Sequence, residues 1–183
     1  MASRPNLDIE VYEESAIEPE LSQEIGQHLY DCFSWRQAIN DRTRTWYGQK
    51  PEYTVIGRVN GILIAHTAIV KRRYLTKDQC PDGRFPADPA VLAQAQVGAG
   101  IQGVSVAESY RRHRYGMEIL TAAMRQAIDA GYPIAILHAP HSLDAFYSLL
   151  GWRWDNDIAF ILDAWDKPAH TQPGNCCMTA DLT

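Results

Sequence analysis

The sequence of 183 residues predicts a single α/β domain with a central sheet of mixed direction. Short apolar runs typical of strands recur along the chain, and segments with apolar residues at helical spacing separate several of them. Asn60-Gly61, between two alternating apolar runs, predicts an antiparallel hairpin. A strand–helix–strand order over 101–139 predicts a parallel crossover. We therefore expect the order β-α-α-β-β-β-α-β-α-β, with helices on both faces of the sheet.

The first third of the chain contains four predicted elements. "LDIEVYEE" (7–14) alternates apolar and polar residues, which is typical of a strand. The apolar spacing in "AIEPELSQEIGQHLYDCFSW" predicts a helix over about 18–33, and the polar stretch 34–50 predicts a short helix and a loop. "EYTVIGRVNGILIAHTAIVKRRYLT" (52–76) supplies the two strands of the hairpin.

The middle of the chain carries a glycine-rich strand and the clearest helix. The proline-rich stretch 76–96 predicts a loop, and "GAGIQGVSV" (98–106) predicts a strand whose glycines favour a bend or bulge. "GMEILTAAMRQAIDAG" (116–131) predicts a helix that ends at a glycine. Its expected apolar face consists of Met117, Leu120, Met124, Ala127 and Ile128.

The last part of the chain predicts a buried strand, a short helix and a final strand. "YPIAILHA" (132–139) is continuously apolar, which favours a central strand covered on both faces. A short helix follows over 142–151 and a last strand over 157–165. The polar residues 167–183 predict a flexible tail, so the expected domain is 1–166.

Composition excludes several classes of protein. The net charge of −5 argues against a general binder of nucleic acid or of membrane surfaces. No apolar run reaches the roughly 20 residues of a membrane span, and no secretory leader is evident, so a cytoplasmic protein is expected. None of the four cysteines forms a C-x-x-C pair, which favours neither a metal site nor a disulfide framework.

The stretch "GVSVAESYRRHRYG" (103–116) carries the strongest chemical signal. It leads from a strand into a helix, whose first backbone N–H groups and dipole attract anions. Arg111, Arg112 and Arg114 add positive charge, and Gly116 lets the backbone come close to a ligand. The pattern favours a phosphate-bearing ligand. The alternative is a set of solvated arginines in an exposed loop.

Two segments resemble the GCN5-related N-acyltransferase (GNAT) superfamily. "VSVAESYRRHRYGMEIL" resembles its acyl-CoA-binding segment, with Arg111 at the first motif position, Arg114 at the first glycine position and Gly116 at the last. "AFYSLLGW" (145–152) resembles the family's Tyr-x-x-x-Gly-Phe signature, with Tyr147 as the tyrosine. The two occur in the order and at the distance that the family's fold requires.

The resemblance implies an enzyme that transfers an acyl group, most simply acetyl, from acyl-CoA to an amine of a small molecule, with no metal. Amides of the strand would hold the pantetheine arm and the thioester carbonyl, and amides of the loop the pyrophosphate. The implied cofactor-binding residues are Val104, Ser105, Val106, Arg111, Arg112, His113, Arg114, Tyr115 and Gly116.

Narrower resemblances and two departures bear on the substrates. "RTWYGQKPEY" (44–53) and "NGILIAHTAIVKRRY" (60–74) resemble nodulation N-acyltransferases, and the second also resembles aminoglycoside 2'-N-acetyltransferases. Arg114 replaces a glycine, which leaves the phosphopantetheine of an acyl carrier protein as an alternative donor in a biosynthetic pathway. Gln102 stands where aminoglycoside-modifying relatives have a glutamate, and an amide cannot accept a proton.

Amine acylation requires an oxyanion site, a proton donor and a proton acceptor. Backbone N–H groups near Val104 and Val106 are the oxyanion candidates, and Tyr147, by its motif position, is the acid; it can equally be a packed aromatic residue. His66 and His138 are candidate bases. His66 can instead be a core histidine, and a chain of water molecules can replace a single base.

Four aromatic residues are candidates for the pocket that binds the amine acceptor or the acyl group. Tyr30, Trp35, Trp46 and Tyr47 are expected to line an apolar substrate pocket, or else belong to the core. A non-catalytic acyl-CoA-binding module, or thioester hydrolysis or decarboxylation on the same fold, are the rival functions. A homodimer is possible on this sequence.

Overall fold

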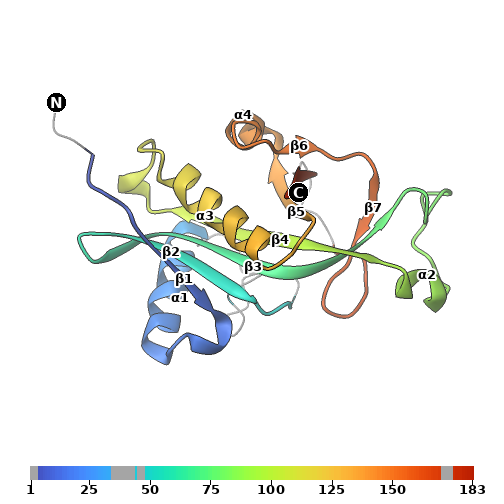
Figure 1. The fold of residues 1–183 in the computed structure, drawn as a ribbon, viewed down its shortest axis with the longest axis horizontal. Helices are drawn as coiled ribbons and strands as arrows, with labels where there is room; N and C mark the ends of the chain where they lie inside the picture. The colour runs from blue at the N-terminus through green and yellow to red at the C-terminus, as the bar shows by residue number, and fades with distance from the viewer. Residues whose placement is uncertain (1–3, 34–43, 45–47, 170–174) are drawn as a thin grey trace.

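One sheet runs through the whole molecule (Figure 1). The structure is a computed structural model and describes residues 4–33, 44, 48–169 and 175–183. Its eight described strands have the order β1-β2-β3-β4-β5-β8-β6, with β7 paired to β3. The strands are β1 (Asp8–Glu13), β2 (Tyr53–Val59), β3 (Ile62–Thr76), β4 (Gln96–Val106), β5 (Ile134–Pro140), β6 (Arg153–Trp154), β7 (Ile158–Ile161) and β8 (Asn175–Asp181).

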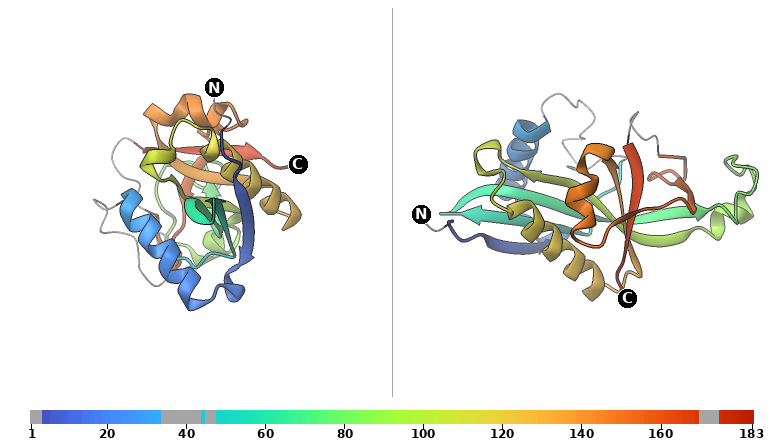
Figure 2. Two further views of the ribbon diagram at one scale, coloured as in Figure 1. Left: turned by 90° about the vertical axis from the view of Figure 1, so that its left-hand side faces the viewer. Right: turned by 90° about the horizontal axis from the view of Figure 1, so that it is seen from above.

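Helices lie on both faces of this sheet, as predicted. The helices are α1 (Pro19–Phe33), α2 (Pro89–Ala93), α3 (Tyr115–Asp129) and α4 (Asp144–Ser148). Figure 2 shows α1 on one face and α3 on the opposite face. Ile25 and Leu29 of α1 pack on Ile56 and Leu63, because these apolar residues recur on one side of the helix. Among the described residues, no helix is both long and apolar enough to cross a membrane.

The buried face of α3 is turned slightly from the predicted one. Leu120 and Ala127 are buried as expected, but Ile128 is 49% exposed and Met117 and Met124 are only half-buried. The residues of α3 that face the sheet are Tyr115, Ile119, Leu120, Ala123 and Ala127. Two alanines at i, i+4 spacing let this side of the helix approach the strands closely, which leaves Ile128 at the edge.

The predicted hairpin joins β2 to β3. Asn60 and Gly61 have φ angles of 51° and 79°, so both adopt the left-handed conformation that a two-residue type I′ turn requires. β3 is long enough to pair with β2 near its start and with β7 near its end. The last strand predicted over 157–165 is therefore β7 (Ile158–Ile161), which extends the far end of the hairpin.

β4 pairs with β5 only at Ala99 and Gly100 and then bulges against β3. His66 faces Ser105 and Ala68 faces Gln102, so the single residue Thr67 lies opposite two residues of β4. This is the irregularity that the glycines of β4 predict. On its other side β4 pairs with β5 in parallel only at Ala99 and Gly100. The edge of β4 from Ile101 to Val106 has no described strand beside it on that side.

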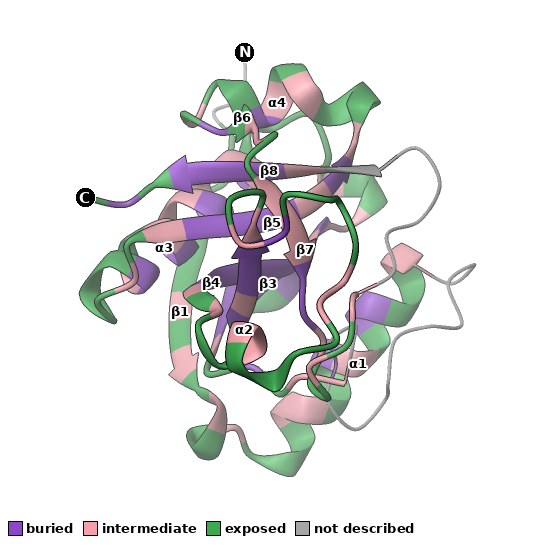
Figure 3. Cartoon of the chain, turned by 90° about the vertical axis from the view of Figure 1, so that its right-hand side faces the viewer, coloured by how far each residue is buried: buried purple, intermediate pink, exposed green. Residues whose placement is uncertain are grey.

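The prediction of a flexible tail over 167–183 is wrong for its last part. Residues 175–181 form β8, which pairs antiparallel with β5 along its length and also with β6. Met178 is 0% exposed, and Figure 3 shows β8 beside β5 with buried residues along it. The domain therefore extends beyond residue 166. The small and polar residues of this segment hide the strand signal, because its burial comes from its neighbours.

Candidate active site

A cavity opens beside the part of β4 that has left β5. It has a volume of about 470 Å³ and is bounded by β4, the loop before α3, the first turn of α3, and α4. Of the predicted donor-binding residues, those that line it are Val104, Ser105, Val106, Arg111, Arg112, Arg114, Tyr115 and Gly116. His113 does not. Sequence reasoning missed four further lining residues: Tyr110, Met117, Leu143 and Phe146.

The loop before α3 offers a run of free backbone donors. Arg112 and Arg114 have φ angles of 67° and 65°, in the left-handed region. The first hydrogen bond of the helix comes from the N–H of Met117 to the carbonyl of Arg114. In the described structure, no backbone carbonyl accepts from the N–H groups of 112–116. Such consecutive free donors at a helix N-terminus form an anion-binding cradle.

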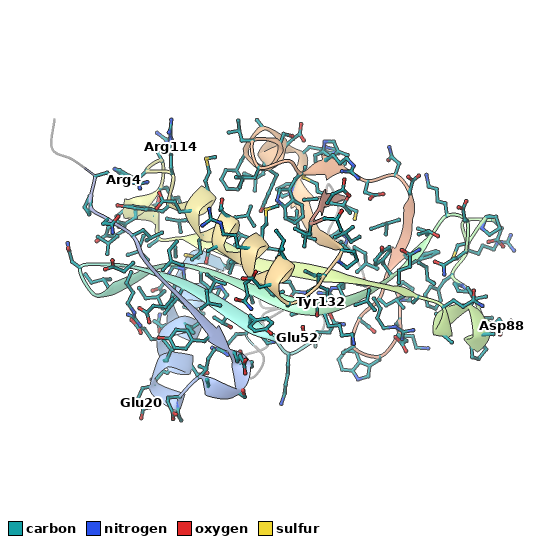
Figure 4. All side chains as sticks on the ribbon, in the orientation of Figure 1. Arg4, Glu20, Glu52, Asp88, Arg114 and Tyr132 are labelled. Carbon is teal, nitrogen blue, oxygen red and sulfur yellow. The ribbon has the colours of Figure 1, made fainter. Side chains whose placement is uncertain are left out.

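Arg114 keeps the backbone conformation that a glycine adopts easily at its position. It is exposed, and Figure 4 shows its side chain directed outward from the molecule. The replacement of glycine by Arg114 therefore does not place a side chain over the free N–H groups. Arg111 folds back toward the sheet, where its Nε donates to the Val106 carbonyl at 3.0 Å.

A further cation reaches this loop from the N-terminal segment. The guanidinium of Arg4 lies 4.6 Å from the centre of the Tyr115 ring, pairs with Glu118 at 2.5 Å and donates to the carbonyl of His113. Tyr115 donates from its hydroxyl to the Pro5 carbonyl at 2.8 Å. No local signal in the sequence predicts this contact, because 109 positions separate Arg4 from His113.

Tyr147 is both a packed aromatic residue and a lining residue of the cavity. Its ring contacts Phe146 and Trp152, with centroid distances of 4.9 Å and 6.0 Å. Burial raises the pKa of Tyr147 to about 12. The phenol therefore keeps its proton at neutral pH and can donate it to a leaving group.

His66 shapes the bulge of β4. It is 1% exposed, and its Nδ1–H donates to the Gly103 carbonyl at 3.0 Å. Burial lowers the pKa of His66 to about 3. Gly103 has a φ of 63°, and a Cβ there would lie 3.2 Å from the His66 ring. This is the arrangement of a hydrogen-bonded core histidine, and His66 does not line the cavity.

The remaining predicted residues do not reach the cavity in the described structure. His138 pairs with Cys177 across β5 and β8, and burial and the charge of Arg72 lower its pKa to about 4. Tyr30 is 65% exposed on α1 and is absent from the cavity wall. Trp35, Trp46 and Tyr47 lie outside the described residues.

Sequence reasoning also missed His28. This residue of α1 is 7% exposed, and its Nε2 lies 3.0 Å from Oγ of Ser105, a lining residue of the cavity. Burial lowers the pKa of His28 to about 4, so the ring is neutral at physiological pH. The helical spacing of α1 places His28 on the buried side next to Leu29, which is a weak signal by itself.

Comparisons with known proteins agree on the fold. A family model described as an acetyltransferase (GNAT) domain matches residues 84–154. The chain is similar to the structure of ElaA from Escherichia coli (TM-score 0.64, 13% identity, 96% of this chain and 100% of that one). It is also similar to an acyl-CoA N-acyltransferase from Pseudomonas aeruginosa (TM-score 0.64, 12% identity, 96% and 99%). No curated protein matches the chain in sequence.

A third solved structure, an acetyltransferase of the GNAT family from Staphylococcus aureus, matches with a TM-score of 0.57 and 10% identity over 96% of this chain and 100% of that one. Sequence identities this low indicate a shared fold but do not indicate a shared substrate. The narrower resemblance to nodulation and aminoglycoside acyltransferases stays a prediction.

Proposed function

We propose that this chain, which belongs to the GNAT superfamily by its fold and its match over 84–154, transfers an acyl group from acyl-CoA to an amine of a small molecule. One observation carries the proposal. In the part of the chain that the structure describes, one cavity is lined by the start of α3, whose first N–H groups have no backbone acceptor, by the edge of β4 that does not pair with β5, and by Tyr147. These are the groups that acyl transfer from a phosphate-bearing thioester requires.

The donor would lie along β4 with its phosphates at α3. The N–H groups of 112–116 and the side chain of Arg111 would bind the pyrophosphate, and Arg4 adds charge beside them. The edge of β4 beyond Gly100 would bind the pantetheine arm through backbone hydrogen bonds. Because Arg114 extends outward, the cradle has room for a nucleotide-bearing carrier, which favours coenzyme A over an acyl carrier protein.

In the reaction the amine attacks the thioester carbonyl carbon, so a C–N bond forms and the C–S bond breaks. Backbone N–H groups near Val104 and Val106 would stabilise the negative charge on the carbonyl oxygen. Fixed donors of this kind contribute about 10²–10³-fold to the rate. Tyr147 would donate its proton to the leaving thiolate, and the hydroxyl would regain a proton from solvent.

Calorimetric titration tests the donor site. We expect acetyl-CoA to bind the protein more tightly than acetyl-phosphopantetheine, and Arg111→Ala to weaken acetyl-CoA binding by about 10-fold, because a charge-assisted contact to phosphate contributes about 1.5 kcal/mol. Arg125→Ala, which removes the same charge from an exposed position on α3, should bind like the parent. Equal affinity for the two donors would favour an acyl carrier protein, and unchanged binding by Arg111→Ala would contradict this phosphate site.

Turnover separates the proposal from its rivals. Incubation with acetyl-CoA and a panel of small amines, followed by mass spectrometry, should yield an N-acetylated product and free thiol in equal amounts. Binding of acetyl-CoA without any product from the panel would support a non-catalytic binding module. Thiol release without acylated amine would indicate hydrolysis instead.

A further inference from the structure

The cavity is connected through β4 to a buried histidine on the opposite helix. Ser105 lines the cavity, and its Oγ lies 3.0 Å from Nε2 of His28 on α1. The two residues are 77 positions apart in the sequence. Ser105 is thus a lining residue of the cavity whose hydroxyl contacts a neutral imidazole on α1. A neutral imidazole nitrogen facing a hydroxyl can accept its proton.

The bulge of β4 explains why Ser105 is in this position. Two residues of β4, Gly103 and Val104, occupy the space opposite Thr67 alone, so the alternation of side chains changes at this point. His66 of β3 holds the bulge in place by donating a hydrogen bond to the Gly103 carbonyl. Ser105 follows directly after it and is held against α1. β4 therefore carries, at a residue that lines the cavity, a hydroxyl in contact with His28.

Other candidate acceptors among the described residues are less well placed. Nδ1 of His66 is committed to the Gly103 carbonyl, and neither His66 nor His138 lines the cavity. Sγ of Cys32 lies 3.7 Å from Nε2 of His28, but burial raises the pKa of this thiol, so it stays protonated at neutral pH. His28 is the imidazole that contacts the hydroxyl of a residue lining the cavity.

We propose that Ser105 and His28 form the proton-accepting pair of the reaction. This inference rests on the proposed N-acyltransferase function. As the C–N bond forms, Oγ of Ser105 accepts the proton of the attacking amine and passes its own proton to Nε2 of His28. The imidazole becomes an imidazolium, and Tyr147 gives its proton to the thiolate. The proton held by His28 then balances the one that Tyr147 has lost, and exchange with water restores both.

Ser105 touches the substrate in this scheme, and His28 acts through it. The charged and titratable groups around His28 are mixed in sign. Its own helix carries Glu24 and Asp31, whose charges favour the imidazolium, and the thiol of Cys32; His66 lies behind it on β3, and Arg111 lies beyond Cys32. Desolvation outweighs the two carboxylates, so the resting imidazole is neutral and available as an acceptor.

The variants His28→Gln and Ser105→Ala test the pair. Glutamine can keep a hydrogen bond to Ser105 but cannot accept a proton. We expect each variant to lower kcat by about 10²-fold or more, the usual contribution of a positioned base, while acetyl-CoA affinity measured by calorimetry stays within 2-fold. Ser105→Thr, which retains the hydroxyl, should recover most of the activity. Gln27→Ala, an exposed neighbour on α1, is the matched control.

The pH profile of kcat distinguishes proton transfer from support of the fold. In the parent, kcat should fall in acid as His28 becomes protonated, and His28→Gln should lose this acid limb. An unchanged kcat and acid limb in His28→Gln would overturn the inference while leaving the proposed function intact. If the parent itself acylates no amine although it binds acetyl-CoA, the proposed function fails instead. A folded His28→Gln with low kcat and an unaltered acid limb would also overturn the inference.

Discussion

In the loop before α3, arginines occupy backbone conformations that glycine adopts most easily. Arg112 and Arg114 both adopt the left-handed conformation, which costs a non-glycine residue about 1 kcal/mol. The side chain of Arg114 points outward from the molecule. Among the described residues, the loop thus keeps backbone N–H groups without a backbone acceptor although it lacks the glycine of the GNAT motif at this position, and its arginines add positive charge.

Tyr147 lines the cavity and is the proton donor that we propose. We expect Tyr147→Phe to lower kcat by about 10- to 1000-fold, because it removes a proton donor while keeping the packed ring. Acetyl-CoA affinity should change little. Steady-state kinetics at saturating substrates and calorimetry measure the two quantities.

Tyr12→Phe provides the control, since the Tyr12 hydroxyl bonds to Glu10 on β1 and is absent from the cavity wall. An undiminished kcat in Tyr147→Phe would assign Tyr147 to packing alone. Because burial raises the pKa of Tyr147 to about 12, the acid should remain available throughout the neutral range.

At the scale of elements, β4 builds most of the site. It leaves β5 after Gly100, which exposes its edge, and it bulges at Gly103, which places Ser105 against α1. The proteins that share the fold need not share these contacts, since fold alone does not determine the reaction. The chemistry that we propose therefore depends on a short irregular part of one strand.

Gly103→Ala tests the bulge. An added Cβ would lie 3.2 Å from the His66 ring at a φ of 63°, so the variant combines backbone strain with a close contact. We expect it to lower the free energy of unfolding by about 1–3 kcal/mol, measured with urea, and to weaken acetyl-CoA binding.

Gly131→Ala is a matched comparison. Gly131 has a φ of 80°, but a Cβ there would meet open space. Gly131→Ala should lower the free energy of unfolding by about 1 kcal/mol, from backbone strain alone, and should bind acetyl-CoA like the parent. Equal losses of stability in the two variants, with normal binding in both, would mean that the His66 contact and the bulge do not matter to the site.

At the scale of the whole molecule, β8 completes the sheet between β5 and β6. Met178 is fully buried, and truncating a buried methionine leaves a cavity. We expect Met178→Ala to lower the free energy of unfolding by about 2–5 kcal/mol. The exposed Thr183→Ala should change it by less than about 0.5 kcal/mol. If Met178→Ala also changed the free energy of unfolding by less than about 0.5 kcal/mol, residues 175–183 would be a loose tail and not part of the core.

Three buried histidines predict how stability depends on pH. The folded-state pKa values of His28, His66 and His138 are about 4, 3 and 4, below the ordinary value of 6.5. The unfolded chain therefore takes up protons first as the pH falls below 6.5. The contribution of these histidines to the free energy of unfolding is therefore fully present above pH 6.5. It is lost as the pH falls toward the folded-state pKa values.

Urea unfolding at pH 7 and pH 5 measures this effect. At pH 5 the pH lies about 1.5 units below the unfolded pKa of 6.5, and one unit corresponds to about 1.4 kcal/mol. The parent should therefore lose roughly 2 kcal/mol for each of the three histidines, about 6 kcal/mol in all, between these pH values. His66→Gln should show a smaller loss over the same interval. An equal loss in parent and variant would mean that His66 titrates normally in the folded protein.

Local patterns in the sequence determine much of the fold and part of the site. The hairpin at Asn60-Gly61, the helices α1 and α3, and the bend of β4 follow from turn chemistry, apolar period and glycine placement, which act between near neighbours. The arginine-bearing loop and Tyr147 follow from motifs of the same local kind. Most of the predicted donor-binding residues do line one cavity.

Only the tertiary structure decides the features that join distant segments. The bond between His28 and Ser105 spans 77 positions, and Arg4 meets His113 across 109. β8 is buried because β5 and β6 lie on either side of it, although its own residues carry no strong strand pattern. Such contacts depend on how strands are ordered in the sheet and which faces the helices cover. The sequence alone thus determines most of the elements and the arginine-bearing loop, whereas packing determines that β8 is a buried strand and that His28 contacts Ser105.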